Sequence, residues 1–272
     1  MIERGYIDNG ESGQIHFAQT GTGIPVLLLH QTPRSWDEFR EVMQQCDNTI
    51  HCIAMDLPGM GASSPTREPP TIEAFADAAI RLIESFDCDS IVVCGHHTGG
   101  VVAIDIAARR PNLVRSLLLS STPWVDRAAR VQRRDKTPID TVSRSRDGSH
   151  LIDLWRQRDS YYPKHPETSV EYMDRFMASA LQADGPERGH HAVGRYEMEL
   201  AAPRIHCPTL IVEHMADPFA TRHTADLQRA FPHADFEQIP KGGVALEATA
   251  PQFADILQRW VCKTDYASQQ TP

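Results

Sequence analysis

A short stretch of this sequence places two histidines between glycines, directly after an apolar run. Residues 94–100 read Cys-Gly-His-His-Thr-Gly-Gly, and residues 91–93 before them are Ile-Val-Val. A strand that runs into Gly-x-x-x-Gly and then into a helix has the form of a nucleophile elbow, a sharp turn that exposes its central side chain for catalysis. That centre normally carries serine and here carries His97. We therefore predict that an imidazole, not a hydroxyl, is the reactive group.

The backbone at such a centre usually adopts a strained conformation with positive φ. Histidine is among the few residues other than glycine that are enriched at positive φ. Gly95 and Gly99 have no Cβ that could obstruct the exposed side chain. The sequence is therefore compatible with His97 at the centre of the turn.

The elements that must position this turn alternate between strands and helices. Asn9-Gly10 between two weak strand patterns predicts a hairpin. The predicted strands are 5–8, 14–19, 25–30, 50–56, 90–94, 115–119, 209–213 and 235–239. The predicted helices are 35–45, 71–86, 98–109 and 251–260. This alternation predicts an α/β fold with a mostly parallel central sheet and helices on both faces.

Residues 124–202 interrupt the alternation. They are rich in Arg, Asp, Tyr and His, with helical patterns at 151–158, 170–181 and 192–199. We interpret them as a helical cap over the active face, inserted between the two parts of the core domain, 1–123 and 203–272. Several aromatic and methionine side chains of the cap either contact an apolar ligand or form the cap's own core. They are Trp124, Trp155, Tyr161, Tyr162, Met173, Phe176 and Met177.

Composition and charge limit the kinds of function that the chain can have. The 272 residues are 41% hydrophobic and carry a net charge of −9 with histidine neutral. This size suits one large α/β domain, and the acidic balance argues against nucleic acid as a partner. The apolar runs are shorter than the about 18–20 residues that span a membrane, and the start has no signal-peptide pattern. We therefore expect a cytoplasmic protein without a membrane partner.

Metal and cofactor sites are not expected. The six cysteines form no Cys-x-x-Cys pair, which argues against zinc-ribbon and thioredoxin sites and favours reduced thiols. The side chains of adjacent histidines usually diverge, and no metal-ligand spacing converges with His96 and His97. Gly-x-Gly-x-x-Gly is absent, which argues against a nucleotide.

Motifs along nearly the whole chain resemble those of the α/β-hydrolase fold family. In order they are His30-Gln31, 56–61 (DLPGMG), 95–99 (GHHTG), 208–217 (PTLIVEHMAD) and 242–247 (GGVALE). The resemblance implies that Asp217 is the acid of the catalytic triad. It also implies that the backbone N–H groups of Gln31 and Thr98 form the oxyanion hole, which stabilises negative charge on a carbonyl oxygen.

Two positions depart from this family. His97 stands where the family has serine, and Val244 stands where it has the catalytic histidine. An acyl-enzyme route needs a hydroxyl and an imidazole within hydrogen-bond reach, so we do not expect an ordinary serine esterase. Haloalkane and epoxide chemistry need aspartate at the elbow, which counts against both. We predict instead a dyad in which Asp217 orients His97, which acts as general base or nucleophile.

Other candidate site residues lie near these motifs. The Gln31 side chain either contacts substrate or faces the surface, and Arg34 either holds a substrate carboxylate or pairs with Asp37 or Glu38. His96 is substrate-binding or packed. The remaining candidate substrate-binding residues are His30, Trp124 and Val244. Alternative bases are His190, His191 and His214, and Asp126 is an alternative acid.

The pattern as a whole predicts an enzyme that acts on a small organic carbonyl or ester substrate. We expect cofactor-free hydrolysis or cleavage of a carbon–carbon bond, as in a lyase, without a serine acyl-enzyme. The alternative is a catalytically silent binding protein, a receptor or carrier of a small molecule. A second copy of the chain is a candidate partner, in a homodimer.

Overall fold

The computed structural model describes residues 1–66, 68–134, 136–161 and 170–269. Among these, eight strands form one sheet in the order β1-β2-β4-β3-β5-β6-β7-β8. They are β1 (Glu3–Asp8), β2 (Gln14–Thr20), β3 (Ile24–Leu29), β4 (Ile50–Met55), β5 (Ile91–His96), β6 (Val114–Ser120), β7 (Thr209–His214) and β8 (Asp235–Ile239). Only the pairs of β1 with β2 and β2 with β4 are antiparallel in this sheet. The predicted fold class is confirmed.

The hairpin predicted around Asn9-Gly10 is confirmed, since β1 and β2 pair antiparallel. A short 3-10 helix, η1 (Gly10–Ser12), joins the two strands. The loop closes through a hydrogen bond from the Asn9 N–H to the Gly13 carbonyl (2.7 Å). Gly10 and Gly13 both adopt positive φ, which glycine does at no steric cost.

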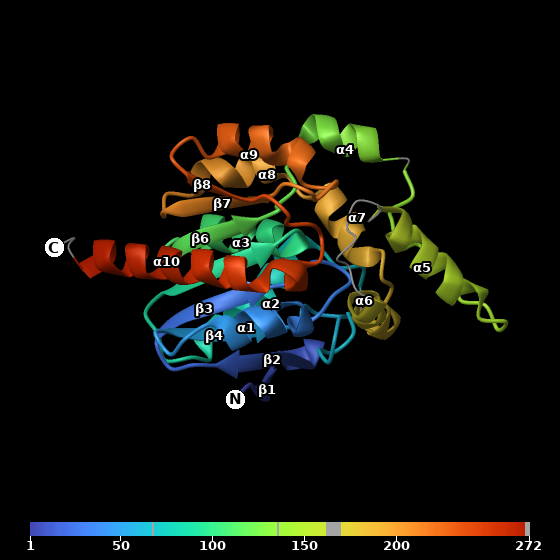
Figure 1. Cartoon of the computed structure of the whole chain (residues 1–272), viewed down its shortest axis with the longest axis horizontal. Helices are drawn as coiled ribbons and strands as arrows, with labels where there is room; N and C mark the ends of the chain where they lie inside the picture. Colours follow the sequence, from blue (N-terminus) through green and yellow to red (C-terminus); the bar gives the residue numbers. More distant parts are fainter. Residues whose placement is uncertain (67, 135, 162–169, 270–272) are drawn as a thin grey trace.

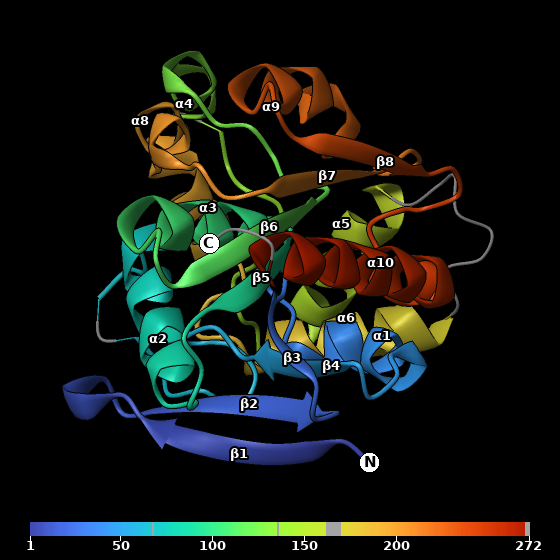
Figure 2. The same cartoon turned by 90° about the vertical axis from the view of Figure 1, so that its left-hand side faces the viewer.

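Helices cover both faces of the sheet (Figure 2). One face packs against α1 (Arg40–Gln45), which continues the 3-10 helix η2 (Trp36–Phe39), and against α10 (Ala250–Gln269). The other packs against α2 (Ile72–Glu84), α3 (Thr98–Arg109) and α9 (Thr224–Ala230). Side chains that alternate along the central strands therefore enter two separate cores.

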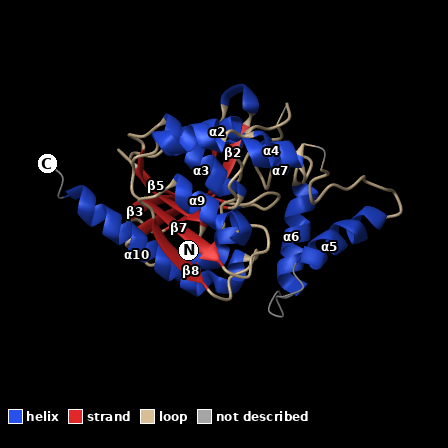
Figure 3. Ribbon diagram, turned by 90° about the horizontal axis from the view of Figure 1, so that it is seen from above, coloured by secondary structure: helices blue, strands red, loops and turns tan. Residues whose placement is uncertain are grey.

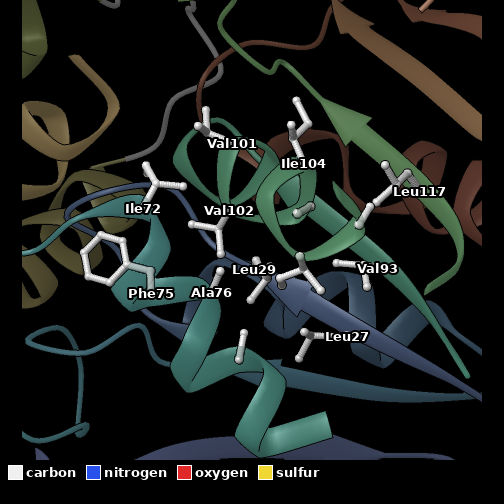
Figure 4. Packing of buried hydrophobic residues seen from close by; sticks show 14 of the residues in the cluster. Leu27, Leu29, Ile72, Phe75, Ala76, Val93, Val101, Val102, Ile104 and Leu117 are labelled. Carbon is white, nitrogen blue, oxygen red and sulfur yellow. The ribbon is translucent and has the colours of Figure 1, made fainter. Parts of the chain in front are cut away.

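The core on the α2–α3 side holds the elbow in place (Figure 4). Leu29 of β3 and Val93 of β5 pack against Val102 of α3 and Phe75 of α2, all fully buried. The first turn of α2 is capped by Thr71, whose Oγ1 accepts the Ala74 N–H (3.1 Å). Because this packing fixes β5 and α3, the turn that joins them has little freedom to move.

Among the helices between β6 and β7, α5 and α6 lie beyond one end of the sheet (Figures 1 and 3), whereas α8 packs against α3. They are α4 (Arg127–Arg133), α5 (Ser149–Tyr161), α6 (Val170–Gln182), α7 (Arg188–Arg195) and α8 (Met198–Ala201). The predicted helix at 192–199 is wrong in its bounds, because the chain is extended at Tyr196 between α7 and α8. Tyr162 lies outside the described residues.

Part of this segment has a core of its own. Leu154 of α5 packs with Phe176 and Ala180 of α6, and the Arg158 guanidinium lies 4.3 Å from the Phe176 ring centroid. Phe176 therefore belongs to the internal core, not to a ligand surface. In the described part of the chain, no helix has the length and apolar content needed to cross a membrane.

Candidate active site

His97 occupies the turn between β5 and α3. Its backbone adopts φ 48° and ψ −112°, and its N–H donates to the Ser120 carbonyl of β6 (3.0 Å). The two flanking glycines allow α3 to approach the sheet closely. A Cβ on Gly99 would lie 1.9 Å from the Leu29 carbonyl oxygen, and one on Gly95 would lie 2.2 Å from the Gly99 carbonyl carbon. The local sequence thus fixes the direction in which His97 leaves the main chain.

Asp217 meets the imidazole of His97. The loop after β7 brings Asp217 Oδ2 within 2.6 Å of His97 Nε2. Asp217 Oδ1 accepts the N–H groups of Phe219 (2.9 Å) and Ala220 (3.2 Å), so the carboxylate cannot rotate freely. When His97 is neutral, a carboxylate at Nε2 favours the tautomer with the proton on that nitrogen. Nδ1 is then the ring nitrogen with a lone pair available to a ligand.

The charge state of Asp217 follows from its surroundings. The carboxyl group is fully buried, which by itself would raise its pKa. The His97 charge and the hydrogen bond to its ring outweigh burial and hold the pKa of Asp217 well below its usual range. Asp217 is therefore ionised at neutral pH and can stabilise a protonated His97.

Two further histidines lie behind His97 but are hydrogen-bonded within the protein. The Ser120 hydroxyl lies 2.9 Å from His96 Nδ1 and 3.1 Å from His214 Nε2. The His96 and His97 rings are nearly perpendicular, with centroids 4.6 Å apart. Burial lowers the pKa of His214 to about 4 and that of His96 well below its usual value, so both are neutral. The prediction that His96 binds substrate is wrong, because its buried ring does not line the cavity.

One of the two predicted oxyanion donors is already occupied. The Gln31 N–H donates to Glu38 Oε2 (2.8 Å), so this part of the prediction is corrected. Thr98 is the first residue of α3, and the first N–H groups of a helix have no helical acceptor. The next N–H along the turn, that of Thr32, donates a long hydrogen bond to the Thr98 hydroxyl oxygen (3.4 Å), which a ligand oxygen can replace more readily than the carboxylate at Gln31. We therefore assign Thr98 and Thr32 as the N–H pair, and Thr32 lies one residue after the predicted Gln31.

The Gln31 side chain belongs to a buried polar network. Its Nε2 donates to Glu38 Oε1 (2.5 Å) and to the Val244 carbonyl (3.0 Å). Burial, the first and largest influence, raises the pKa of Glu38 to about 7 against the opposing effect of Arg34. Arg34 is itself 3% exposed and paired with Glu247 rather than with Asp37 or Glu38 as predicted. This network holds the turn after β3 against the segment that follows β8.

Several predicted substrate-binding residues lie in the core instead. His30 is fully buried, and its Nε2 accepts the Leu57 N–H (3.0 Å) while Nδ1 contacts the Gln31 carbonyl (2.7 Å). Trp124 packs in the apolar core, Val244 is buried and its carbonyl accepts Gln31 Nε2, and Arg34 is buried and paired with Glu247. None of these four lines the cavity above His97. Hydrophobic burial and internal hydrogen bonding explain all four positions. Asp126, the alternative acid, caps α4 by accepting the Ala129 N–H (2.8 Å).

A cavity of about 1350 Å³ opens above His97, Thr98, Gln31 and Thr32. Its walls come from α4, α7 and the loop after β7. They carry eight cationic side chains, namely Arg127, Arg130, Arg133, Arg134, Lys136, Arg158, Arg195 and Arg222. Glu197 and Glu199 are the only carboxylates among its described lining residues. The cavity is therefore basic although the chain is acidic overall, a contrast that composition could not predict.

The predicted alternative base His190 also lines this cavity, beside His191. His190 Nε2 lies 2.9 Å from Asp140 Oδ2, so a second histidine–aspartate pair faces the same space. Asp140 is fully buried and also accepts two bonds from Arg158 of α5. Burial, opposed by Asp140, lowers the pKa of His190. His190 thus remains a second candidate base at the cavity wall.

Comparisons with known proteins agree with this architecture. A sequence model of the Alpha/beta hydrolase family matches residues 26–256. An (E)-2-((N-methylformamido)methylene)succinate hydrolase of Acinetobacter baylyi is 24% identical over 250 residues, 90% of this chain and 93% of the relative. A soluble epoxide hydrolase of Corynebacterium sp. is 32% identical over 106 residues, which span 39% of this chain and 37% of that relative. A Pseudomonas aeruginosa hydrolase structure superposes with TM-score 0.80 at 18% identity, over 95% of this chain and 98% of that chain.

Proposed function

Because this chain belongs to the alpha/beta hydrolase family, we propose that it is a cofactor-free hydrolase in which His97 is the general base. In this proposal, His97 and Val244 replace the serine and the histidine of a conventional catalytic triad. The observation that carries the proposal is the 2.6 Å contact between His97 Nε2 and Asp217 Oδ2, which leaves Nδ1 for a ligand in the cavity.

In the proposed reaction, His97 Nδ1 takes a proton from a water molecule as that water attacks the substrate carbonyl carbon. Asp217 stabilises the imidazolium that forms. The N–H groups of Thr98 and Thr32 stabilise the negative charge on the carbonyl oxygen. When the tetrahedral species collapses, the leaving group receives the proton from Nδ1. No covalent bond to the protein forms.

The substrate class is a small compound with an ester or amide carbonyl. The relative that matches 90% of this chain is named as a hydrolase of a succinate derivative with an N-methylformamido group. Its reaction class agrees with attack of water on a carbonyl. The same site would serve carbon–carbon cleavage if the substrate placed a ketone beside His97 Nδ1. The remaining alternative is a catalytically silent receptor, which would bind the ligand without converting it.

The test compares hydrolysis of p-nitrophenyl acetate and p-nitrophenyl formate by wild type, His97→Ala and Asp217→Asn. Loss of a general base lowers rates by about 10²–10⁴-fold, so we expect kcat/KM to fall by that order in both variants. His206→Ala changes an exposed histidine away from the cavity and serves as control. Intact mass spectra should show no acylated protein during turnover.

The outcomes separate the rival readings. An unchanged rate in His97→Ala overturns the proposal. A further variant, His190→Ala, is measured in the same assay, and a loss of activity in that variant alone assigns the base to the pair of His190 and Asp140. Acylation that persists only when His97 is present makes His97 a nucleophile. Binding of substrate without any turnover by wild type identifies a receptor.

A further inference from the structure

Two arginines that the proposed reaction does not use face the cavity on either side of His223. Arg133 is the last residue of α4, and its Nη2 lies 3.1 Å from His223 Nε2. Arg222, in the 3-10 helix η4 (Thr221–His223), donates from Nε to the same nitrogen (3.2 Å). We propose that Arg133 and Arg222 bind a carboxylate group of the substrate. Figures 1 and 2 show that α4 lies beside the η4–α9 segment that completes this subsite.

The charge balance around these arginines favours an anion from outside. Both lining glutamates, Glu197 and Glu199, are hydrogen-bonded to Arg130. In the described portion of the chain, no carboxylate is hydrogen-bonded to Arg133 or Arg222. Arg133 is half-buried, and burial together with the Arg222 charge lowers its pKa. A bound carboxylate would offset both effects through charge-assisted hydrogen bonds.

His223 holds the two guanidinium groups in position. Burial is the largest of the influences that lower its pKa to about 4, followed by the charges of Arg133, Arg222 and His97. His223 is therefore neutral at neutral pH, and its Nε2 accepts from both arginines. Their remaining N–H groups can point at a ligand, because guanidinium groups carry several donors in a fixed plane.

The subsite and the proposed reaction centre share one loop. Thr221 donates its hydroxyl hydrogen to the Asp217 carbonyl (3.0 Å), so the position of η4 is tied to that of the aspartate at His97. Phe219, between them, lines the cavity, as do Val193 and Leu200. We therefore place the substrate carboxylate at these two arginines and its reacting carbonyl at His97. This inference rests on the proposed function for the place of the scissile bond, but not for anion binding itself.

The test measures binding of succinate and of its neutral analogue succinamide by isothermal titration calorimetry. Wild type should bind succinate at least about tenfold more tightly than succinamide, since charge-assisted bonds exceed neutral ones by about 1.4 kcal/mol or more. Arg133→Gln and Arg222→Gln should each weaken succinate binding at least about tenfold. Arg133→Lys, which keeps the charge, should lose less. Arg229→Gln removes an exposed charge from α9 outside the cavity and should bind as wild type does.

Failure of this inference differs from failure of the proposed function. Equal affinity of wild type and both glutamine variants for succinate overturns the subsite. Equal affinity of wild type for succinate and succinamide also overturns it, as does the absence of succinate binding by wild type. Circular dichroism and thermal melts check that each variant is folded. Because Arg222 is exposed and Arg133 is half-buried, Arg222→Gln should disturb folding less than Arg133→Gln. His97→Ala should bind succinate normally while losing turnover. If it binds succinate and also keeps its turnover, the subsite stands and the proposed reaction falls.

Discussion

At the scale of single residues, the polar groups around His97 divide into those that face the cavity and those that support it. His97 faces the cavity with 12% of its side chain exposed, while Asp217 beneath it is fully buried. The sequence could predict this pair because an elbow and an acid-bearing loop have recognisable patterns. It could not predict that Glu38 occupies the Gln31 N–H, because no sequence pattern shows which buried carboxylate reaches a given donor.

Glu38 makes stability depend on pH. Its pKa is raised from 4.5 to about 7, so between these values the folded protein holds a proton that the unfolded chain has lost. Its contribution to stability is fully present below pH 4.5 and is lost as the pH rises through about 7. We expect the free energy of unfolding to fall over this interval, with a slope of at most about 1.4 kcal/mol per pH unit.

Urea denaturation at a series of pH values measures this slope. Glu38→Gln removes this titrating group and should flatten the slope. An identical slope in Glu38→Gln and wild type would assign the pH dependence to other groups.

At the scale of elements, apolar periodicity separates the helices that the sequence predicts from those that it misses. α2 buries a continuous face that includes Ile72, Phe75 and Leu82, so its pattern is plain in the sequence. α4 has no fully buried residue and begins at its cap Asp126, the residue predicted as an alternative catalytic acid. A helix without a buried face carries no periodic signal, which is why the arginines that α4 contributes to the cavity were missed.

The close contact of α3 with the sheet yields a prediction for two glycines. Gly99→Ala would place a Cβ 1.9 Å from the Leu29 carbonyl oxygen, which forces the elbow away from β3. We expect a loss of about 1–3 kcal/mol in the free energy of unfolding. Gly194→Ala in α7 meets nothing within 4 Å and should instead stabilise the protein by about 0.5–1 kcal/mol. Thermal or urea denaturation compares the stability of the two variants. Equal changes would show that the close approach of β3 to α3 does not restrict the residue at position 99.

At the scale of the whole molecule, a buried ion pair joins the helices between β6 and β7 to the turn beside His97. Arg158 of α5 is 2% exposed, pairs with Asp140 and contacts the Thr32 carbonyl (3.5 Å). The same carboxylate accepts from His190 of α7. None of these contacts could be predicted from the sequence, because the three residues belong to separate segments with no common motif.

Asp140→Asn removes the negative charge that faces Arg158 and His190 while keeping the shape of the side chain. Asparagine also tolerates the positive φ of 69° at this position. Because the buried guanidinium then loses the negative charge of Asp140, we expect a loss of about 3 kcal/mol in the free energy of unfolding. Asp184→Asn breaks the partly exposed pair with Arg188 and should change stability by less than about 1 kcal/mol. Urea denaturation measures the free energy of unfolding of both variants. Equal losses in Asp140→Asn and Asp184→Asn would show that the buried pair adds no more stability than the partly exposed one.

The attachment of His97 to Asp217 through Nε2 also affects steric access. Nδ1 is bonded directly to Cγ, so the nitrogen left for chemistry is the one nearer the main chain. A bulky group on the acyl carbon should therefore hinder the approach of its carbonyl to that nitrogen. In the proposed reaction, we expect p-nitrophenyl formate and acetate to be hydrolysed faster than the branched pivalate ester.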